Sequence, residues 1–79
     1  LKFNSALIES IKKVDYSGNI IVLSTYPGLA NAVAAGLDSI ETNEILGSVA
    51  GDDTIFIVTR GLDSSKSLSE RIKILLKTV

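Results

Sequence analysis

The segment Thr54–Thr59 constrains the fold more than any other part of the sequence. It reads Thr-Ile-Phe-Ile-Val-Thr, and β-branched and aromatic residues of this kind favour a strand. Apolar and polar residues do not alternate along it, so we expect the strand to be buried on both faces. Helices of the same chain can cover one face, and a second subunit is expected to cover the other.

Two further runs predict strands of the same sheet. Ile20–Thr25 is rich in β-branched residues, and Ile45–Ala50 is joined to Thr54–Thr59 by the short turn Gly51–Asp53. Because short turns connect antiparallel strands, these spacings predict a mostly antiparallel sheet.

The N-terminal segment Leu1–Val14 has two interpretations. Its apolar residues recur at helical spacing, at Phe3, Leu7, Ile11 and Val14. However, residues 15–19 form a strong turn signal before Ile20–Thr25, and a hairpin needs a partner strand before its turn. We therefore predict a strand for at least the second half of Ile8–Tyr16.

Pro27 and Gly28 are predicted to end one strand and to begin a helix that runs to about Ile40, because proline suits the first helical position. The core stripe of this helix is expected at Leu29, Ala32, Val33, Gly36, Leu37 and Ile40. A second stripe of small and short polar residues comprises Asn31, Ala34, Ala35 and Asp38. Since Lys, Arg and Glu are absent from this helix, we favour a contact surface over a solvated face for the second stripe.

The last helix is predicted from about Ser65 to Lys77, capped by Ser64 or by Ser67 with Glu70. Its buried stripe is expected at Leu68, Ile72, Leu75, Leu76 and Val79. The resulting order, ββαββα, indicates the α+β class. We predict a two-layer sandwich in which a four-stranded, mostly antiparallel sheet carries both helices on one face.

A chain of 79 residues forms a single domain, residues 1–79, and a domain of this size is only marginally stable alone. It contains no Cys and no His, which excludes disulfides and Cys or His metal sites as staples. Of its residues, 46% are hydrophobic, which is more than a two-layer domain of this size can bury. We therefore expect a homo-oligomer. It also has no Met, so we expect it to be part of a longer protein.

Charge and hydropathy exclude two classes of partner. The net charge of −1 argues against a grip on a nucleic-acid backbone by this chain itself. The apolar runs are too short to cross a membrane, and residues 1–4 do not resemble a secretory signal. We therefore expect a cytoplasmic protein without a membrane partner.

The most informative residues for function are Gly51–Asp53 and the following Thr54. Adjacent carboxylates repel each other unless a cation joins them, and the nearest basic residue in sequence, Arg60, lies beyond the next strand. Aspartate is also a common turn residue, and from the residues alone a plain turn is slightly favoured. The functional alternatives are an oxygen-rich metal site and a site for a guanidinium, which carboxylates bind in bidentate geometry.

The start of the first helix is a second candidate, because free N–H groups and partial positive charge there can hold a carboxylate. Combined with the acidic turn, it suggests a site for a zwitterion. In this hypothesis Asn31 helps to hold an α-carboxylate and Asp38 takes an α-ammonium. No nucleophile–base pair and no phosphate-binding glycine motif occurs, so catalysis is poorly supported.

The segments Val22–Gly28 and Ile45–Ile55, together with the helix end Leu37-Asp38, resemble the C-terminal domain of the bacterial arginine repressor. The resemblance covers nearly the whole chain, and the Gly-Asp-Asp-Thr turn at this distance from a Thr-x-Pro-Gly turn is fairly specific. It implies a transcriptional regulator whose N-terminal winged helix–turn–helix domain, absent from this chain, reads operator DNA. It also implies trimers that stack in pairs into a hexamer.

The same resemblance implies that L-arginine binds between subunits as co-repressor, with Asp52 and Asp53 engaging it in a shared site. Asn31 and Asp38 are implied to complete the site around the amino-acid end. Asn31 is often Gln in the family and is one methylene shorter, so its contact is expected to pass through water or to fall to the backbone near Ala30. The full set of expected ligand contacts is Asp52, Asp53, Asp38, Asn31, Ala30 and Thr54.

Two alternatives from other classes remain open. The chain could be a purely structural oligomerisation module in which the acidic residues only shape a turn. It could also be a small enzyme with a metal held by Asp52, Asp53 and Asp38, although the lack of His disfavours this. No catalytic residue, metal or cofactor other than the arginine ligand is expected.

Overall fold

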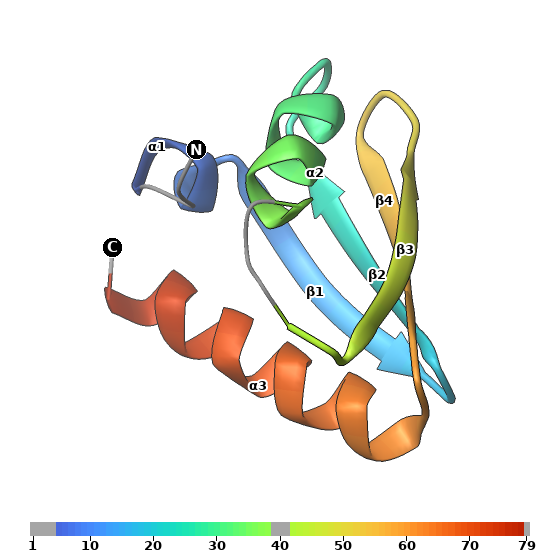
Figure 1. Cartoon of the computed structure of the whole chain (residues 1–79). Coiled ribbons are helices and arrows are strands. Elements are labelled where there is room, and N and C mark those ends of the chain that lie inside the picture. Colours follow the sequence, from blue (N-terminus) through green and yellow to red (C-terminus); the bar gives the residue numbers. More distant parts are fainter. Residues whose placement is uncertain (1–4, 39–41, 79) are drawn as a thin grey trace.

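The computed structural model describes residues 5–38 and 42–78. Its elements are, in chain order, α1 (Ser5–Glu9), β1 (Ile11–Ser17), β2 (Ile20–Thr25), α2 (Ala30–Asp38), β3 (Ile45–Ala50), β4 (Thr54–Thr59) and α3 (Leu62–Thr78). The strands form one antiparallel sheet in the order β1-β2-β4-β3, and the helices lie on one of its faces (Figure 1). The predicted α+β two-layer architecture is confirmed, with α1 as an additional element.

The N-terminal segment contains both predicted structures, one after the other. Its first part forms α1, which ends where the Ser10 N–H donates to the Leu7 carbonyl at 3.1 Å. The strand then begins at Ile11 and includes the second half of Ile8–Tyr16, as predicted. Phe3, the first residue of the helical pattern, lies outside the described residues. The hairpin that follows turns at Gly18, whose φ of 57° suits glycine because it has no Cβ.

The connection from β2 to α2 differs from the prediction. The Leu29 N–H donates to the Tyr26 carbonyl at 3.2 Å, and Gly28 has a φ of 81°. Pro27 and Gly28 therefore occupy the central positions of a type II turn, which needs a positive φ at its third residue. Consequently α2 begins at Ala30, three residues after the predicted start, and the predicted end at Ile40 lies outside the described residues.

The buried face of α2 agrees with the prediction at Val33, Gly36 and Leu37 and differs at its edges. Leu29 and Ala32, two predicted core residues, are exposed, whereas Ala34, predicted for the contact stripe, is buried. The buried residues of α2 are Ala30, Val33, Ala34, Gly36 and Leu37. The solvent-facing side of α2 carries Asn31, Ala35 and Asp38, so three of the four residues of the predicted contact stripe do share an exposed face.

Helix α3 begins at Leu62, and the Ser65 N–H donates to the Gly61 carbonyl at 3.0 Å. Both predicted caps were therefore wrong, because Ser64 and Ser67 lie inside the helix. Ser65 is buried, and its Oγ lies 2.7 Å from Thr59 Oγ1, which ties the helix start to the end of β4. Leu68 and Ile72 are buried as predicted, Leu75 is exposed, Leu76 is half-buried, and Val79 lies outside the described residues.

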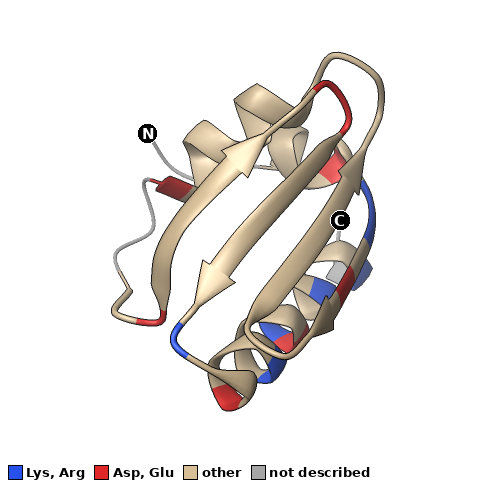
Figure 2. Cartoon of the chain, turned by 90° about the vertical axis from the view of Figure 1, so that its right-hand side faces the viewer, with Lys and Arg blue, Asp and Glu red and all other residues tan. Residues whose placement is uncertain are grey.

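The core lies between the sheet and the helices. Ile55 and Ile57 of β4 and their neighbours in β2 are completely buried on the helical side. The expected burial of β4 on both faces does not occur within one chain, because Phe56 is 48% exposed on the opposite face. That face, which we call the open face, is not covered by any helix of the described residues (Figure 2).

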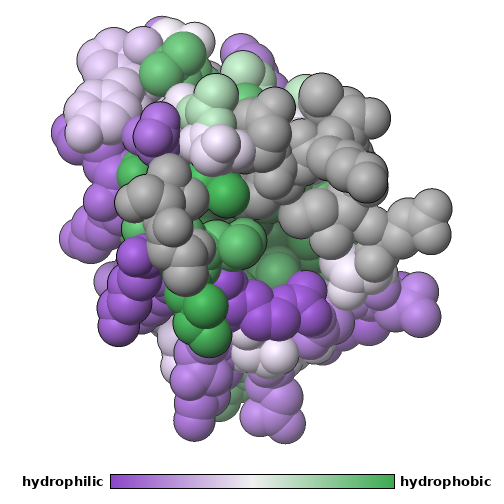
Figure 3. Space-filling model, turned by 90° about the vertical axis from the view of Figure 1, so that its left-hand side faces the viewer, coloured by the Kyte–Doolittle hydropathy of each residue, from purple (hydrophilic) through white to green (hydrophobic). Residues whose placement is uncertain are grey.

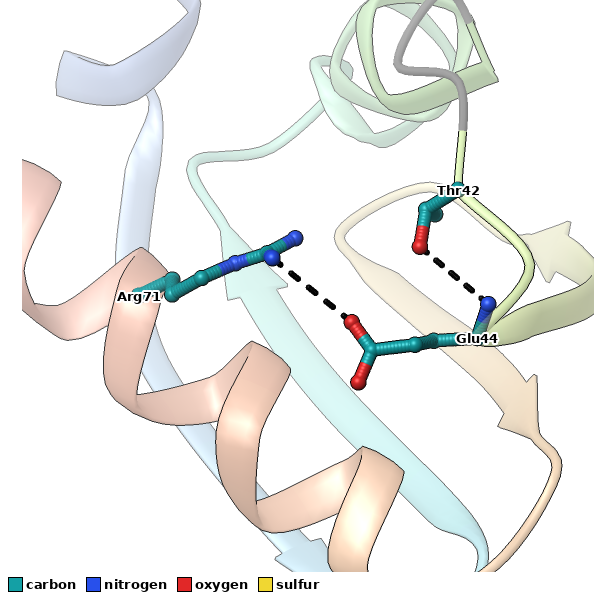
Figure 4. Close-up of polar contacts among 3 residues, drawn as sticks. All are labelled: Thr42, Glu44 and Arg71. Carbon is teal, nitrogen blue, oxygen red and sulfur yellow. Dashed lines mark hydrogen bonds and ion pairs between the residues drawn. The ribbon is translucent and has the colours of Figure 1, made fainter.

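The segment before β3 is fastened to α3 on the helical side. Glu44 Oε1 lies 3.6 Å from Arg71 Nη1, and the Glu44 N–H donates to Thr42 Oγ1 at 3.1 Å (Figure 4). On the side of the molecule that carries α1 and α3, apolar side chains gather between hydrophilic ones (Figure 3). No helix in the described part of the chain has the length and hydropathy needed to span a membrane.

Candidate functional site

The acidic turn between β3 and β4 is a tight and well-bonded structure. The Gly51 N–H donates to the Thr54 carbonyl at 2.8 Å and closes the turn. The Thr54 hydroxyl donates to Asp53 Oδ1 at 3.0 Å. Both aspartates are exposed, and in the described chain no basic side chain forms an ion pair with either of them. The turn therefore presents two adjacent carboxylates whose charges no basic side chain of residues 5–38 and 42–78 neutralises.

This turn is docked onto the start of α2 through its backbone. The Thr25 N–H donates to the Asp53 carbonyl at 2.7 Å, and the Ala30 N–H donates to the Asp52 carbonyl at 3.2 Å. The two candidate features of the sequence, the acidic turn and the helix start, thus lie side by side at one end of the molecule (Figure 1). Two carbonyl contacts fix the backbone of the aspartates and leave their side chains available to a ligand.

The docking of the turn also reduces the number of free N–H groups at the start of α2 that could bind a ligand. Ala30 is buried, and its N–H is already bonded to Asp52, so this N–H is not available for a ligand carboxylate. Asn31, the next residue, is exposed on the solvent side of α2. The ligand contacts of Asn31 and Ala30 stay predictions, with the side chain of Asn31 better placed than the N–H of Ala30.

Asp38 does not lie with the acidic turn in the same chain. It is the last residue of α2, and the helical rise places it about 12 Å along the axis from Ala30. It lines a separate hollow of about 440 Å³, whose other residues are Leu37, Thr42, Asn43, Ile45, Leu46 and Gly47. Within one chain, Asp38 and the acidic turn thus lie at opposite ends of α2.

An apolar hollow borders the acidic turn on the open face. It has a volume of about 290 Å³ and is lined by Val49, Ala50, Gly51, Thr54 and Phe56. Since Thr54 both lines this hollow and binds the Asp53 carboxylate, a carboxylate stands at the rim of an apolar depression. Such a site can accept a ligand with an aliphatic stem and a cationic end.

Thr25 is a residue of this region that was not among the predicted contacts. Its N–H is the shortest backbone link to the acidic turn, and its buried hydroxyl donates to the Tyr26 carbonyl at 2.9 Å. The Thr-x-Pro-Gly motif contains Thr25, but only the pairing of β2 with β4 reveals its bond to Asp53. Tyr26 itself turns toward β1, where its ring centre lies 5.6 Å from Lys12 Nζ.

The metal alternative finds little geometric support. Within residues 5–38 and 42–78, no group of three or more His, Cys, Asp or Glu side chains converges on a common point. Asp38, the third carboxylate of that hypothesis, is at the far end of α2 from the other two. Two carboxylates alone do not provide the six to eight oxygen ligands that calcium takes, or the octahedral set that magnesium takes.

The sequence of the chain matches a known protein family. The family described as "Arginine repressor, C-terminal domain" matches residues 7–73 of the chain. This range includes every predicted contact residue and all four strands of the sheet.

Several curated relatives carry the name arginine repressor. The protein from Lachnospira eligens is 43% identical over 76 residues, covering 96% of this chain and 50% of the relative. The protein from Thermoanaerobacter sp. is 45% identical over 71 residues, covering 90% of this chain and 47% of the relative. The chain thus spans about half the length of the relatives it matches. Their name is that of a repressor and not of an enzyme, in agreement with the expectation that the chain is not catalytic.

Proposed function

The chain belongs to the family of the arginine repressor C-terminal domain, and from this we propose that it is the L-arginine-sensing oligomerisation domain of a transcriptional regulator of arginine metabolism. Operator DNA is bound by an N-terminal winged helix–turn–helix domain outside this chain. L-arginine is the co-repressor, and the whole protein acts in the cytoplasm. No metal and no catalytic residue takes part.

One observation carries this proposal. The acidic turn is docked onto the start of α2 by the bonds from Thr25 and Ala30, so that Asp52 and Asp53 are presented together on a fixed backbone. A purely structural turn needs the backbone bonds but has no need of two unneutralised carboxylates side by side. A guanidinium neutralises both and can bind a carboxylate with two parallel hydrogen bonds.

The chemistry of the surroundings also fits arginine. The apolar hollow beside the turn suits the methylene chain, and the carboxylate at its rim suits the charged end. In this proposal the amino-acid end reaches Asn31 and Asp38, which share the exposed side of α2. In the proposal the site is shared between subunits, and the position of Asp38 at the opposite end of α2 from the acidic turn supports this.

The open face supports the assembly part of the proposal. Val49 is 68% exposed and Phe56 is 48% exposed, and the two are paired neighbours on β3 and β4. Large apolar residues exposed side by side mark an interface more often than a solvated surface. We assign this face to contacts between subunits, in trimers that stack in pairs into a hexamer with arginine at the subunit interfaces.

Calorimetric titration of the chain tests the ligand. L-arginine is expected to bind, and L-citrulline, which keeps the length but lacks the charge, is expected to bind at least tenfold more weakly. Light scattering on the same samples is expected to give a larger molar mass with arginine than without it.

The competing function is a structural oligomerisation module without a ligand. It predicts the same oligomer with and without arginine and no heat of binding for either amino acid. Equal binding of arginine and citrulline would reject the assignment of the acidic turn to the guanidinium.

A further inference from the structure

Thr54 is bonded to one of the two aspartates only. Its hydroxyl donates to Asp53 Oδ1 at 3.0 Å, while in the described residues no side-chain donor reaches the Asp52 carboxylate. The backbone of both residues is already fixed by the bonds from Thr25 and Ala30. With the backbone fixed, the side chains of Asp52 and Asp53 can still rotate, and the bond from the Thr54 hydroxyl restricts this rotation for Asp53.

Thr54 is well suited to hold another side chain in place. It is half-buried in β4, opposite Ser24 of β2, so that its own backbone is part of the sheet. A β-branched side chain in a strand has a restricted χ1 angle, which gives the hydroxyl a defined direction. The bond uses one acceptor position of Asp53 Oδ1 and leaves Oδ2 free for a guanidinium.

From this asymmetry we infer that Thr54 is a positioning residue, which holds the Asp53 carboxylate in the orientation that binds the guanidinium, and that its hydroxyl donates to this carboxylate and not to the ligand. The inference rests on the proposed function, and it gives Asp52 and Asp53 different roles. Asp53 is the oriented acceptor, and Asp52 is the adaptable one that adjusts to the bound ligand. A side chain ordered before binding loses less entropy when the ligand arrives.

Three variants test the inference by titration with L-arginine. Thr54→Val keeps the shape of the side chain and its strand preference but removes the donor, and we expect binding between about twofold and tenfold weaker. Thr54→Ser keeps the donor and is expected to bind within about twofold of the unchanged chain. Ser24→Ala removes the hydroxyl across the strand pair, which donates to no carboxylate, and is expected to leave affinity unchanged.

A double-mutant comparison separates positioning from a general effect on the fold. Thr54→Val should weaken binding in an Asp52→Ala background, where Asp53 remains to be oriented. It should have no further effect in an Asp53→Ala background. Equal losses in both backgrounds would overturn the inference, because a structural role does not depend on Asp53.

A measurement without ligand gives a second, independent decision. Side-chain NMR couplings should show one χ1 rotamer of Asp53 in the unchanged chain and averaging in Thr54→Val. An Asp53 rotamer that is the same in both would overturn the inference while arginine binding, and with it the proposed function, still stands. Conversely, if the unchanged chain binds no arginine in the first titration, the proposed function itself is wrong, and this is known before any variant is compared.

Discussion

At the scale of single residues, different groups of the acidic turn hold the fold and remain available to a ligand. The backbone of Asp52 and Asp53 is fixed by carbonyl contacts to Thr25 and Ala30, whereas their carboxylates are exposed. An amide preserves the backbone contacts and the turn, so the two roles can be tested apart.

The first prediction uses this separation. Asp52→Asn and Asp53→Asn should each weaken L-arginine binding by roughly tenfold to a hundredfold, because a charge-assisted hydrogen bond contributes about 1.5–3 kcal/mol. Thermal unfolding should change little, since neither carboxylate is buried or paired with a cation in the described chain. Asp63→Asn, an exposed aspartate in the first turn of α3, serves as the matched control and should leave binding unchanged. Undiminished affinity in both turn variants would reduce the acidic pair to a plain turn.

At the scale of elements, the strands were easier to predict than the helix ends. β2, β3 and β4 have the predicted bounds because a β-branched run and its flanking turn residues are local signals. The start of α2 was misplaced because Pro27 suits both a first helical turn and a type II turn, and only Gly28 with its positive φ decides between them. The burial of Ala34 was not predicted either, because helical spacing alone does not determine how a helix is rotated against the sheet.

Candidate site residues show the same division between local and non-local information. The Asp52–Asp53 pair was visible in the sequence as an acidic turn without a basic neighbour. Its docking onto Thr25 was not, because that bond exists only when β4 pairs with β2. The separation of Asp38 from the turn was also not predictable from helical spacing, which relates Asp38 to Asn31 but not to a loop on another strand.

The second prediction concerns Gly28. Its φ of 81° is unfavourable for any residue with a Cβ, although no atom within 4 Å would obstruct one. Gly28→Ala should therefore lower the free energy of unfolding by about 1–2 kcal/mol through backbone strain alone. Chemical denaturation measures this, and Gly47→Ala, where a Cβ also has open space and φ is not positive, is the control. An unfolding free energy unchanged in Gly28→Ala would contradict the type II turn.

The third prediction concerns the exposed side of α2, which carries Asn31, Ala35 and Asp38. If this side faces the ligand or another subunit, a long side chain between the two polar residues obstructs it. Ala35→Arg should weaken arginine binding or hexamer formation while the far-UV circular dichroism stays unchanged. Ala32→Arg, on an exposed position outside that stripe, is the control. Equal behaviour of the two variants would return this side of α2 to solvent.

At the scale of the whole molecule, the two sides of the sheet are unequal. One face is sealed by helices, and the other carries a row of paired apolar residues across three strands, the half-buried Val22 and the exposed Phe56 and Val49. The sequence alone indicated this imbalance through the unbroken apolar run of β4, which within one chain is covered only on the helical side. A second copy of the chain is the simplest cover for such a face, and cyclic symmetry allows the same patch to be buried in every subunit.

The last prediction tests this cover directly. Phe56 is the largest side chain of that row, and aromatic anchors of this kind commonly contribute at least about 2 kcal/mol to an interface. Phe56→Ser should therefore raise the dissociation constant of the trimer by about thirtyfold or more. The monomer should stay folded, because Phe56 is half exposed and its neighbours Ile55 and Ile57 fill the core.

Sedimentation equilibrium at micromolar concentration measures the effect. The unchanged chain is expected as a trimer or hexamer, and Phe56→Ser as a mixture shifted toward monomer. Ile74→Ser is the matched control, because Ile74 is 61% exposed but lies on α3, away from the open face. If only the Ile74 variant dissociates, the subunits meet through the helical layer. If the unchanged chain is a monomer throughout this range, the open face is not an interface in the isolated domain.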